Sequence, residues 1–175
     1  MPNDLPSGVA YVATSLDGYI ARANGGVDWL PRPPDGEDFG WSAFLKGIDA
    51  LVMGRSTFET VLSFGTWPYG EIPVLVLSST RKEVPEVVAS RVEILDLGPR
   101  DVLRYLAERG AERVYVDGGR TIQAFLREKL LDELVITTVP IVLGGGIPLF
   151  GPMDDALRLT HASTEVLPGG LVKST

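Results

Sequence analysis

Short uninterrupted runs of aliphatic residues recur along much of the chain and predict buried strands. The runs are Gly8 to Ser15, Ala50 to Met53, Pro73 to Leu77, Val92 to Leu95 and Val114 to Val116. They do not alternate between apolar and polar residues, so both faces of each strand should be covered, as in a parallel sheet.

Amphipathic segments between these runs predict helices. The expected helices cover Asp38 to Gly47, a segment around Ser56, Pro99 to Arg109 and Arg120 to Leu131. Ser56 and Glu59 have the spacing of a capping box. Pro99 is a typical first residue of a helix, and Gly110 is a typical stop.

The chain changes character after Leu131. Glu133 to Leu143 is one long extended run that ends in three glycines, Gly144 to Gly146, which suit close packing, a bulge or a subunit contact. Leu157 to Val166 and Gly170 to Lys173 resemble a hairpin. We therefore expect one α/β domain over residues 1–175, with a mostly parallel central sheet flanked by helices and antiparallel C-terminal strands.

Composition and charge exclude several classes of function. Sixteen basic against 23 acidic residues give a net charge of −7, which disfavours nucleic acid and anionic membranes as partners. The absence of cysteine and the single histidine, His161, argue against a metal site, a thiol nucleophile and a Ser-His-Asp triad. No signal peptide or membrane-spanning run is apparent, so a cytoplasmic protein is expected.

Polar and glycine residues follow three of the predicted strands, where parallel sheets bind ligands. Gly54-Arg55-Ser56-Thr57 opens a helix whose N-terminus suits a phosphate, although it could be a helix start with a solvent-facing arginine. Residues 78–82, Ser-Ser-Thr-Arg-Lys, suit a phosphate monoester or form a polar turn. Asp117-Gly118-Gly119 would let a ligand approach the backbone, or be a simple strand-to-helix turn.

Taken in order, these segments resemble one family. VATSLDGYIA, VDWL, EDFGW, VMGRSTFE, VLSSTRK and VDGGRTIQAF are similar to the successive motifs of the dihydrofolate reductase-like superfamily, including the 16-residue spacing from Asp38 to Gly54. The later segment TTVPIVLGGGIPLFG most resembles the riboflavin-biosynthesis reductase domain, the RibD C-terminal domain, and its free-standing relatives.

The resemblance implies NADPH as cofactor and assigns residues to it. The implied cofactor-binding residues are Ala13, Ile20, Gly54, Arg55, Ser56, Thr57, Ser78, Ser79, Arg81, Gly118, Gly119, Arg120 and Thr121. Ser79 and Arg81 would surround the 2′-phosphate. Gly118 and Gly119 would face the pyrophosphate and nicotinamide through a cis or otherwise strained backbone.

The resemblance also implies a substrate side. Trp29, Asp38 and Trp41 would contact the acceptor, and Asp38 would be the catalytic acid, unless it is only a carboxylate at a helix N-terminus. The segment between Trp29 and Asp38 is longer than in folate reductases, and Ser42 replaces a large aromatic residue, so the acceptor pocket should differ from theirs.

These features predict an NADPH-dependent reductase that transfers hydride to a small pterin-like, pyrimidine or imine acceptor. One alternative is the 5-amino-6-(5-phosphoribosylamino)uracil reductase of riboflavin biosynthesis, and another is a non-catalytic NADP-binding homodimer. The expected partners are a small-molecule substrate and, as in riboflavin-type relatives, a second copy of the chain.

Overall fold

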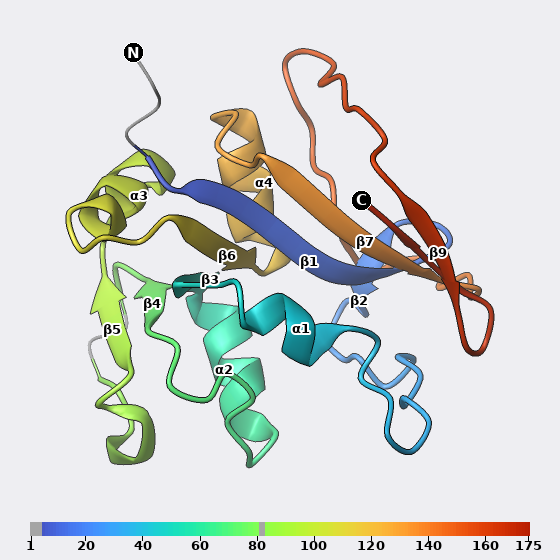
Figure 1. Ribbon diagram of the computed structural model, residues 1–175, viewed down its shortest axis with the longest axis horizontal. Coiled ribbons are helices and arrows are strands. Elements are labelled where there is room, and N and C mark those ends of the chain that lie inside the picture. Colours follow the sequence, from blue (N-terminus) through green and yellow to red (C-terminus); the bar gives the residue numbers. More distant parts are fainter. Residues whose placement is uncertain (1–4, 81–82) are drawn as a thin grey trace.

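A computed structural model of the protein describes residues 5–80 and 83–175, which form a twisted sheet with helices on both faces (Figure 1). The strands of this sheet are β1 (Ser7–Ser15), β3 (Ala50–Gly54), β4 (Val74–Leu77), β5 (Val92–Leu95), β6 (Arg113–Asp117), β7 (Glu133–Val139), β9 (Thr164–Leu167) and β10 (Leu171–Ser174). Their order is β5-β4-β3-β6-β1-β7-β10-β9. All pairs from β5 to β7 are parallel, and β10 pairs antiparallel with β7 and β9, which confirms the predicted architecture.

Alternate residues of the central strands feed two apolar clusters. Val52 and Val116 lie in the cluster that contains the buried residues of α3 (Pro99–Ala107) and α4 (Gly119–Arg127). Leu51, Met53 and Tyr115 lie in the cluster that contains those of α2 (Arg55–Ser63) and, at its margin, residues of α1 (Trp41–Leu45). Because both faces of these strands are buried, their sequences are continuous apolar runs.

The structure corrects the predicted starts of two helices, α1 and α2. The predicted helix over 38–47 is reduced to α1, because Phe39 and Gly40 have positive φ values of 55° and 88° and cannot belong to a right-handed helix. Gly54 is the N-cap of α2, so Ser56 lies inside that helix and the expected capping box is wrong.

The C-terminal hairpin is shorter than predicted. It pairs Thr164–Leu167 with Leu171–Ser174, residue for residue. Residues 157–163 precede it as an exposed segment, and of these Ala162 and Ser163 form backbone hydrogen bonds with Thr175. A second, two-stranded sheet joins β2 (Tyr19–Ala21) to β8 (Ile147–Pro148).

Within the described residues, no helix is long and apolar enough to cross a membrane. A short 3₁₀ helix, η1 (Glu86–Val88), precedes β5.

Candidate functional site at the carboxyl edge of the sheet

Parallel register brings the predicted site segments to one edge of the sheet. Met53 pairs with Asp117, and Gly54 pairs with Leu77, so the carboxyl ends of β3, β4 and β6 lie side by side. β1 continues past them to Ser15, which pairs with Val139 at the end of β7. The loops that follow these strands therefore converge, as the sequence predicts.

Two pairs of predicted cofactor residues pack directly on each other. A Cβ on Gly118 would overlap Thr57 Oγ1, and a Cβ on Gly54 would lie 3.0 Å from Thr121 Oγ1. The starts of α2 and α4 are thus interlocked through backbone that has no side chain. The missing Cβ atoms let the two helix starts pack closely, because Thr57 and Thr121 fill the space that a side chain at Gly118 or Gly54 would need.

The Gly118–Gly119 segment corrects one expectation. The described residues contain no cis peptide bond, so the cis form of the predicted cis or otherwise strained backbone is absent. Gly118 instead has φ 93° and ψ 135°, and this left-handed conformation turns the chain from β6 into α4. A Cβ on Gly119 would lie 2.9 Å from Ile20 Cδ1, which places the predicted Ile20 of β2 beside the double glycine.

The helix N-termini at this edge carry no side-chain caps. Neither Gly54 at α2 nor Gly118 at α4 has a capping side chain, and neither first turn contains an acidic residue. Arg55 and Ser56 are exposed at the start of α2, and Arg120 is exposed at the start of α4. N–H groups and a positive dipole end beside arginine side chains suit an anionic group.

The residues after β4 are described only in part. Ser78 is half-buried and its amide donates to Leu95, while Ser79 is exposed next to it. Arg81 lies outside the described residues. Ala13, the remaining predicted cofactor residue, is half-buried on β1 and pairs with Thr137 of β7.

A carboxyl that sequence reasoning overlooked occupies the centre of this edge. Asp117 ends β6, where its Oδ1 accepts the Gly118 amide at 2.8 Å and its Oδ2 accepts the Tyr69 hydroxyl at 3.4 Å. Burial raises the pKa of Asp117, against the lowering effect of these hydrogen bonds. Burial, and then the charge of Asp117, raise the pKa values of Tyr69 and Tyr115. The sequence signal for this carboxyl was a charged residue at the end of an apolar strand, Asp117 after Val114 to Val116.

The predicted catalytic residue Asp38 has a different environment. It is exposed, and its two carboxylate oxygens accept the amides of Gly40 at 2.9 Å and Ser42 at 2.8 Å. Hydrogen bonds from the Ser42 side chain and backbone, and from Gly40, lower the pKa of Asp38. The carboxylate therefore stabilises the turn into α1 and is ionised near neutral pH.

The two predicted acceptor-side tryptophans lie in different places. Trp41 belongs to an aromatic cluster, with ring centroids 5.8 Å from Tyr115 and 6.2 Å from Tyr69, and so borders the Asp117 environment. Trp29 is buried against Val139 and Leu171 near the C-terminal hairpin. Its Nε1 is buried and has no hydrogen-bond partner among the described residues.

The loop between β1 and β2 is fastened to the glycine triplet. The Asp17 carboxylate accepts the amides of Leu143 at 3.0 Å and Gly144 at 2.8 Å. A Cβ on Gly146 would overlap the Ala21 carbonyl oxygen, so close packing explains this glycine. Hydrogen bonds from the Ser15 side chain, and then from Leu143 and Gly144, lower the pKa of Asp17 to about 2.

Comparison with known proteins decides the family. The model of the RibD C-terminal domain matches residues 6–173, nearly the whole chain. The protein belongs to the RibD C-terminal domain family. The family expected from the sequence motifs is thereby confirmed.

Relatives in this family share both sequence and fold. A solved protein of Shewanella sp. PV-4, provisionally named a riboflavin biosynthesis protein, is 43% identical with a TM-score of 0.91, and each chain covers 96% of the other. YwjB, an uncharacterised protein of Bacillus subtilis strain 168, is 31% identical over 90% of both chains.

A more distant structure confirms the fold of the family's reductase domain. The diaminohydroxyphosphoribosylaminopyrimidine deaminase/5-amino-6-(5-phosphoribosylamino)uracil reductase of Thermotoga maritima has a TM-score of 0.73 at 18% identity. The alignment covers 97% of this RibD C-terminal domain chain and 56% of that protein. The predicted dihydrofolate reductase-like fold is therefore present.

Proposed function

We propose that the protein is an NADPH-dependent reductase that transfers hydride to a small pterin-like, pyrimidine or imine acceptor. The observation that carries this proposal is the convergence of two uncapped helix N-termini, which pack on each other through Gly54 and Gly118, beside the carboxyl of Asp117. Membership of the RibD C-terminal domain family supports the same reaction class.

The residues present fit the cofactor. The first turns of α2 and α4, with Arg55 and Arg120, would hold its phosphates through N–H groups and positive charge. Gly118, Gly119 and Ile20 would accept the flat nicotinamide against backbone. When bound, NADPH supplies the hydride; the protein must align the acceptor, exclude water and provide a proton.

Asp117 is suited to hold that proton. Burial raises the pKa of Asp117, whereas hydrogen bonds from Ser42 and Gly40 lower the pKa of Asp38, so Asp117 is the better proton donor of the two and Asp38 is suited to orient the acceptor. Burial beside Tyr69 and Tyr115 raises the pKa of Asp117, while hydrogen bonds from these two hydroxyls lower it. We therefore assign the proton to Asp117, and to Asp38 a role in shaping the acceptor side.

The test is NADPH oxidation followed at 340 nm with dihydrofolate and with 5-amino-6-(5-phosphoribosylamino)uracil. Asp117→Asn should lower kcat by about 10²- to 10⁴-fold with little change in NADPH affinity, as expected for lost general acid catalysis. Asp38→Asn should mainly raise the KM for the acceptor. The reverse ranking of the two variants would return the proton to Asp38.

The two remaining functions give different outcomes. The riboflavin reaction would require a basic residue for the ribose phosphate, and the early loops offer Arg22 and Arg32. Arg22 forms a bidentate pair with Asp28, at 2.7 and 2.9 Å, and Arg32 is exposed. Turnover of the phosphoribosylaminouracil, and of no unphosphorylated acceptor, would establish that alternative. NADPH binding by calorimetry without oxidation by either acceptor would favour a non-catalytic NADP-binding homodimer.

A further inference from the structure

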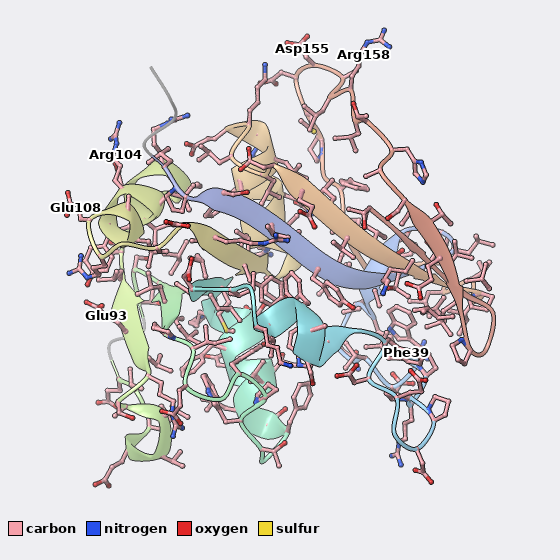
Figure 2. The ribbon with its side chains drawn as sticks, viewed as in Figure 1. Phe39, Glu93, Arg104, Glu108, Asp155 and Arg158 are labelled. Carbon is pink, nitrogen blue, oxygen red and sulfur yellow. The ribbon has the colours of Figure 1, made fainter. Side chains whose placement is uncertain are left out.

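Two side chains from distant parts of the chain hold one carbonyl group of the segment that leads into α1. Tyr11 Oη, on β1, donates to the Phe39 carbonyl oxygen at 2.8 Å. Lys173 Nζ, on β10, donates to the same oxygen at 3.3 Å. Figure 2 shows Phe39 in the chain just before α1, beside the end of the C-terminal hairpin. Side chains of β1 and β10, the first and last strands of the main sheet in chain order, thus meet at this carbonyl.

The backbone at this point is strained. Phe39 has φ 55° and Gly40 has φ 88°, two consecutive residues in the left-handed region. A non-glycine residue in this region is unfavourable and persists only where its surroundings hold it. A Cβ on Gly40 would lie 3.2 Å from Lys173 Nζ and 3.7 Å from Tyr11 Oη, so the same two side chains also enclose Gly40.

Two of the three predicted acceptor-side residues, Asp38 and Trp41, flank the Phe39–Gly40 segment. Asp38 precedes Phe39 and accepts the amides of Gly40 and Ser42. Trp41 follows Gly40, and its ring lies 5.7 Å from that of Tyr11. A rotation of the Phe39–Gly40 backbone would therefore move the Asp38 carboxylate and the Trp41 ring together.

We propose that Tyr11 and Lys173 are positioning residues, which fix Asp38 and Trp41 by holding the Phe39 carbonyl in place. The inference rests on the proposed function for its kinetic consequence, and on geometry alone for its structural one. Lys173 also forms an ion pair with Glu165 at 3.1 Å, and its side chain is only 19% exposed, so its ammonium is constrained on two sides.

The experiment compares variants that remove one donor each. Lys173→Met removes the ammonium and keeps an apolar stem, and Lys173→Arg restores a cationic donor. Tyr11→Phe removes only the hydroxyl and leaves the ring on Phe44, 4.4 Å away. Glu165→Gln breaks only the ion pair, and Lys46→Met removes a lysine charge at the exposed end of α1.

Three quantities are measured on each folded variant. They are amide hydrogen exchange at Gly40 and Ser42 by NMR, the KM for the acceptor, and NADPH affinity by calorimetry. The acceptor is dihydrofolate or the phosphoribosylaminouracil, whichever the wild-type protein reduces. Loss of one hydrogen bond, about 1 kcal/mol, corresponds to a roughly fivefold change.

Lys173→Met and Tyr11→Phe should each speed exchange at both amides and raise the acceptor KM by about fivefold or more, with NADPH affinity within twofold of wild type. Lys173→Arg should recover most of the loss, Glu165→Gln should have a smaller effect than Lys173→Met, and Lys46→Met should match wild type. Unchanged exchange in Lys173→Met and Tyr11→Phe, or equal effects in the controls, would overturn the proposal. A wild-type protein without turnover would defeat the proposed function and leave the exchange result to decide this inference.

Discussion

Thr57 Oγ1 occupies the space that a Cβ on Gly118 would fill, so the first turn of α2 packs directly against the backbone at the start of α4. The two phosphate-binding segments predicted from the sequence are therefore one structural unit. A substitution at Thr57 or Gly118 should therefore alter the packing at the N-termini of both α2 and α4.

Gly118→Ala should abolish measurable NADPH binding. The new methyl group would displace Thr57, and the left-handed backbone at φ 93° costs an alanine about 1 to 2 kcal/mol in addition. Gly119→Ala should be milder, because its Cβ would meet chiefly the flexible end of Ile20 at 2.9 Å. Calorimetry gives the affinities, and urea unfolding gives the stability.

The control for this prediction is the double variant Gly118→Ala/Thr57→Ala. Removing Oγ1 should recover part of the free energy of unfolding that Gly118→Ala loses, since the overlap disappears while the backbone cost remains. Wild-type NADPH affinity in a folded Gly118→Ala variant would show that the cofactor binds elsewhere.

Asp117 should reduce stability at neutral pH. Burial raises its pKa in the folded state above the unfolded value of about 3.9, so the folded protein binds more protons than the unfolded chain between the two values. The free energy of unfolding should fall as pH rises through this window. Asp117→Asn should therefore be more stable than wild type at pH 7, and this advantage should shrink toward pH 4.

Chemical unfolding at a series of pH values measures that difference. Because the same variant should lose turnover, it would show stability and activity changing in opposite directions at one residue. A stability difference that does not vary with pH would mean that Asp117 is ionised at no greater cost in the folded protein than in the unfolded chain.

Asp17 should behave in the opposite sense. Its pKa is lowered to about 2 by Ser15 and by the amides of Leu143 and Gly144, so its contribution to stability is present above about pH 4 and is lost as pH falls toward 2. Asp17→Asn should lower the Tm at pH 7 and speed amide exchange at Leu143 and Gly144. The Tm difference from wild type should vanish near pH 2, and a difference that persists there would contradict this origin.

Strand patterns, register and motif order together predicted the edge at which Gly54 and Gly118 meet. Local conformation was less predictable. The short α1 results from left-handed Phe39, and that conformation depends on Tyr11 and Lys173, which are remote in sequence. Asp117 was overlooked because the shift of its pKa depends on Tyr69 and on burial, which only the folded chain creates.

Arg55 should contribute to the choice between NADPH and NADH. It is the first residue of α2, exposed at an N-terminus without an acidic neighbour in the first turn, and a charge-assisted contact to a phosphate contributes roughly 1.5 to 3 kcal/mol. Arg55→Met should weaken NADPH binding by about tenfold or more in calorimetry, and Arg127→Met, which removes the same charge from the far end of α4, should not.

The NADH titration shows which phosphate Arg55 contacts. If Arg55 contacts the 2′-phosphate together with Ser79 and Arg81, Arg55→Met should weaken NADPH binding far more than NADH binding, and the wild-type preference for NADPH should shrink. An equal loss for both cofactors would place Arg55 at the pyrophosphate instead, where the α2 N-terminus already offers N–H groups. Equal wild-type affinities for NADPH and NADH would remove the 2′-phosphate site from this edge of the sheet altogether.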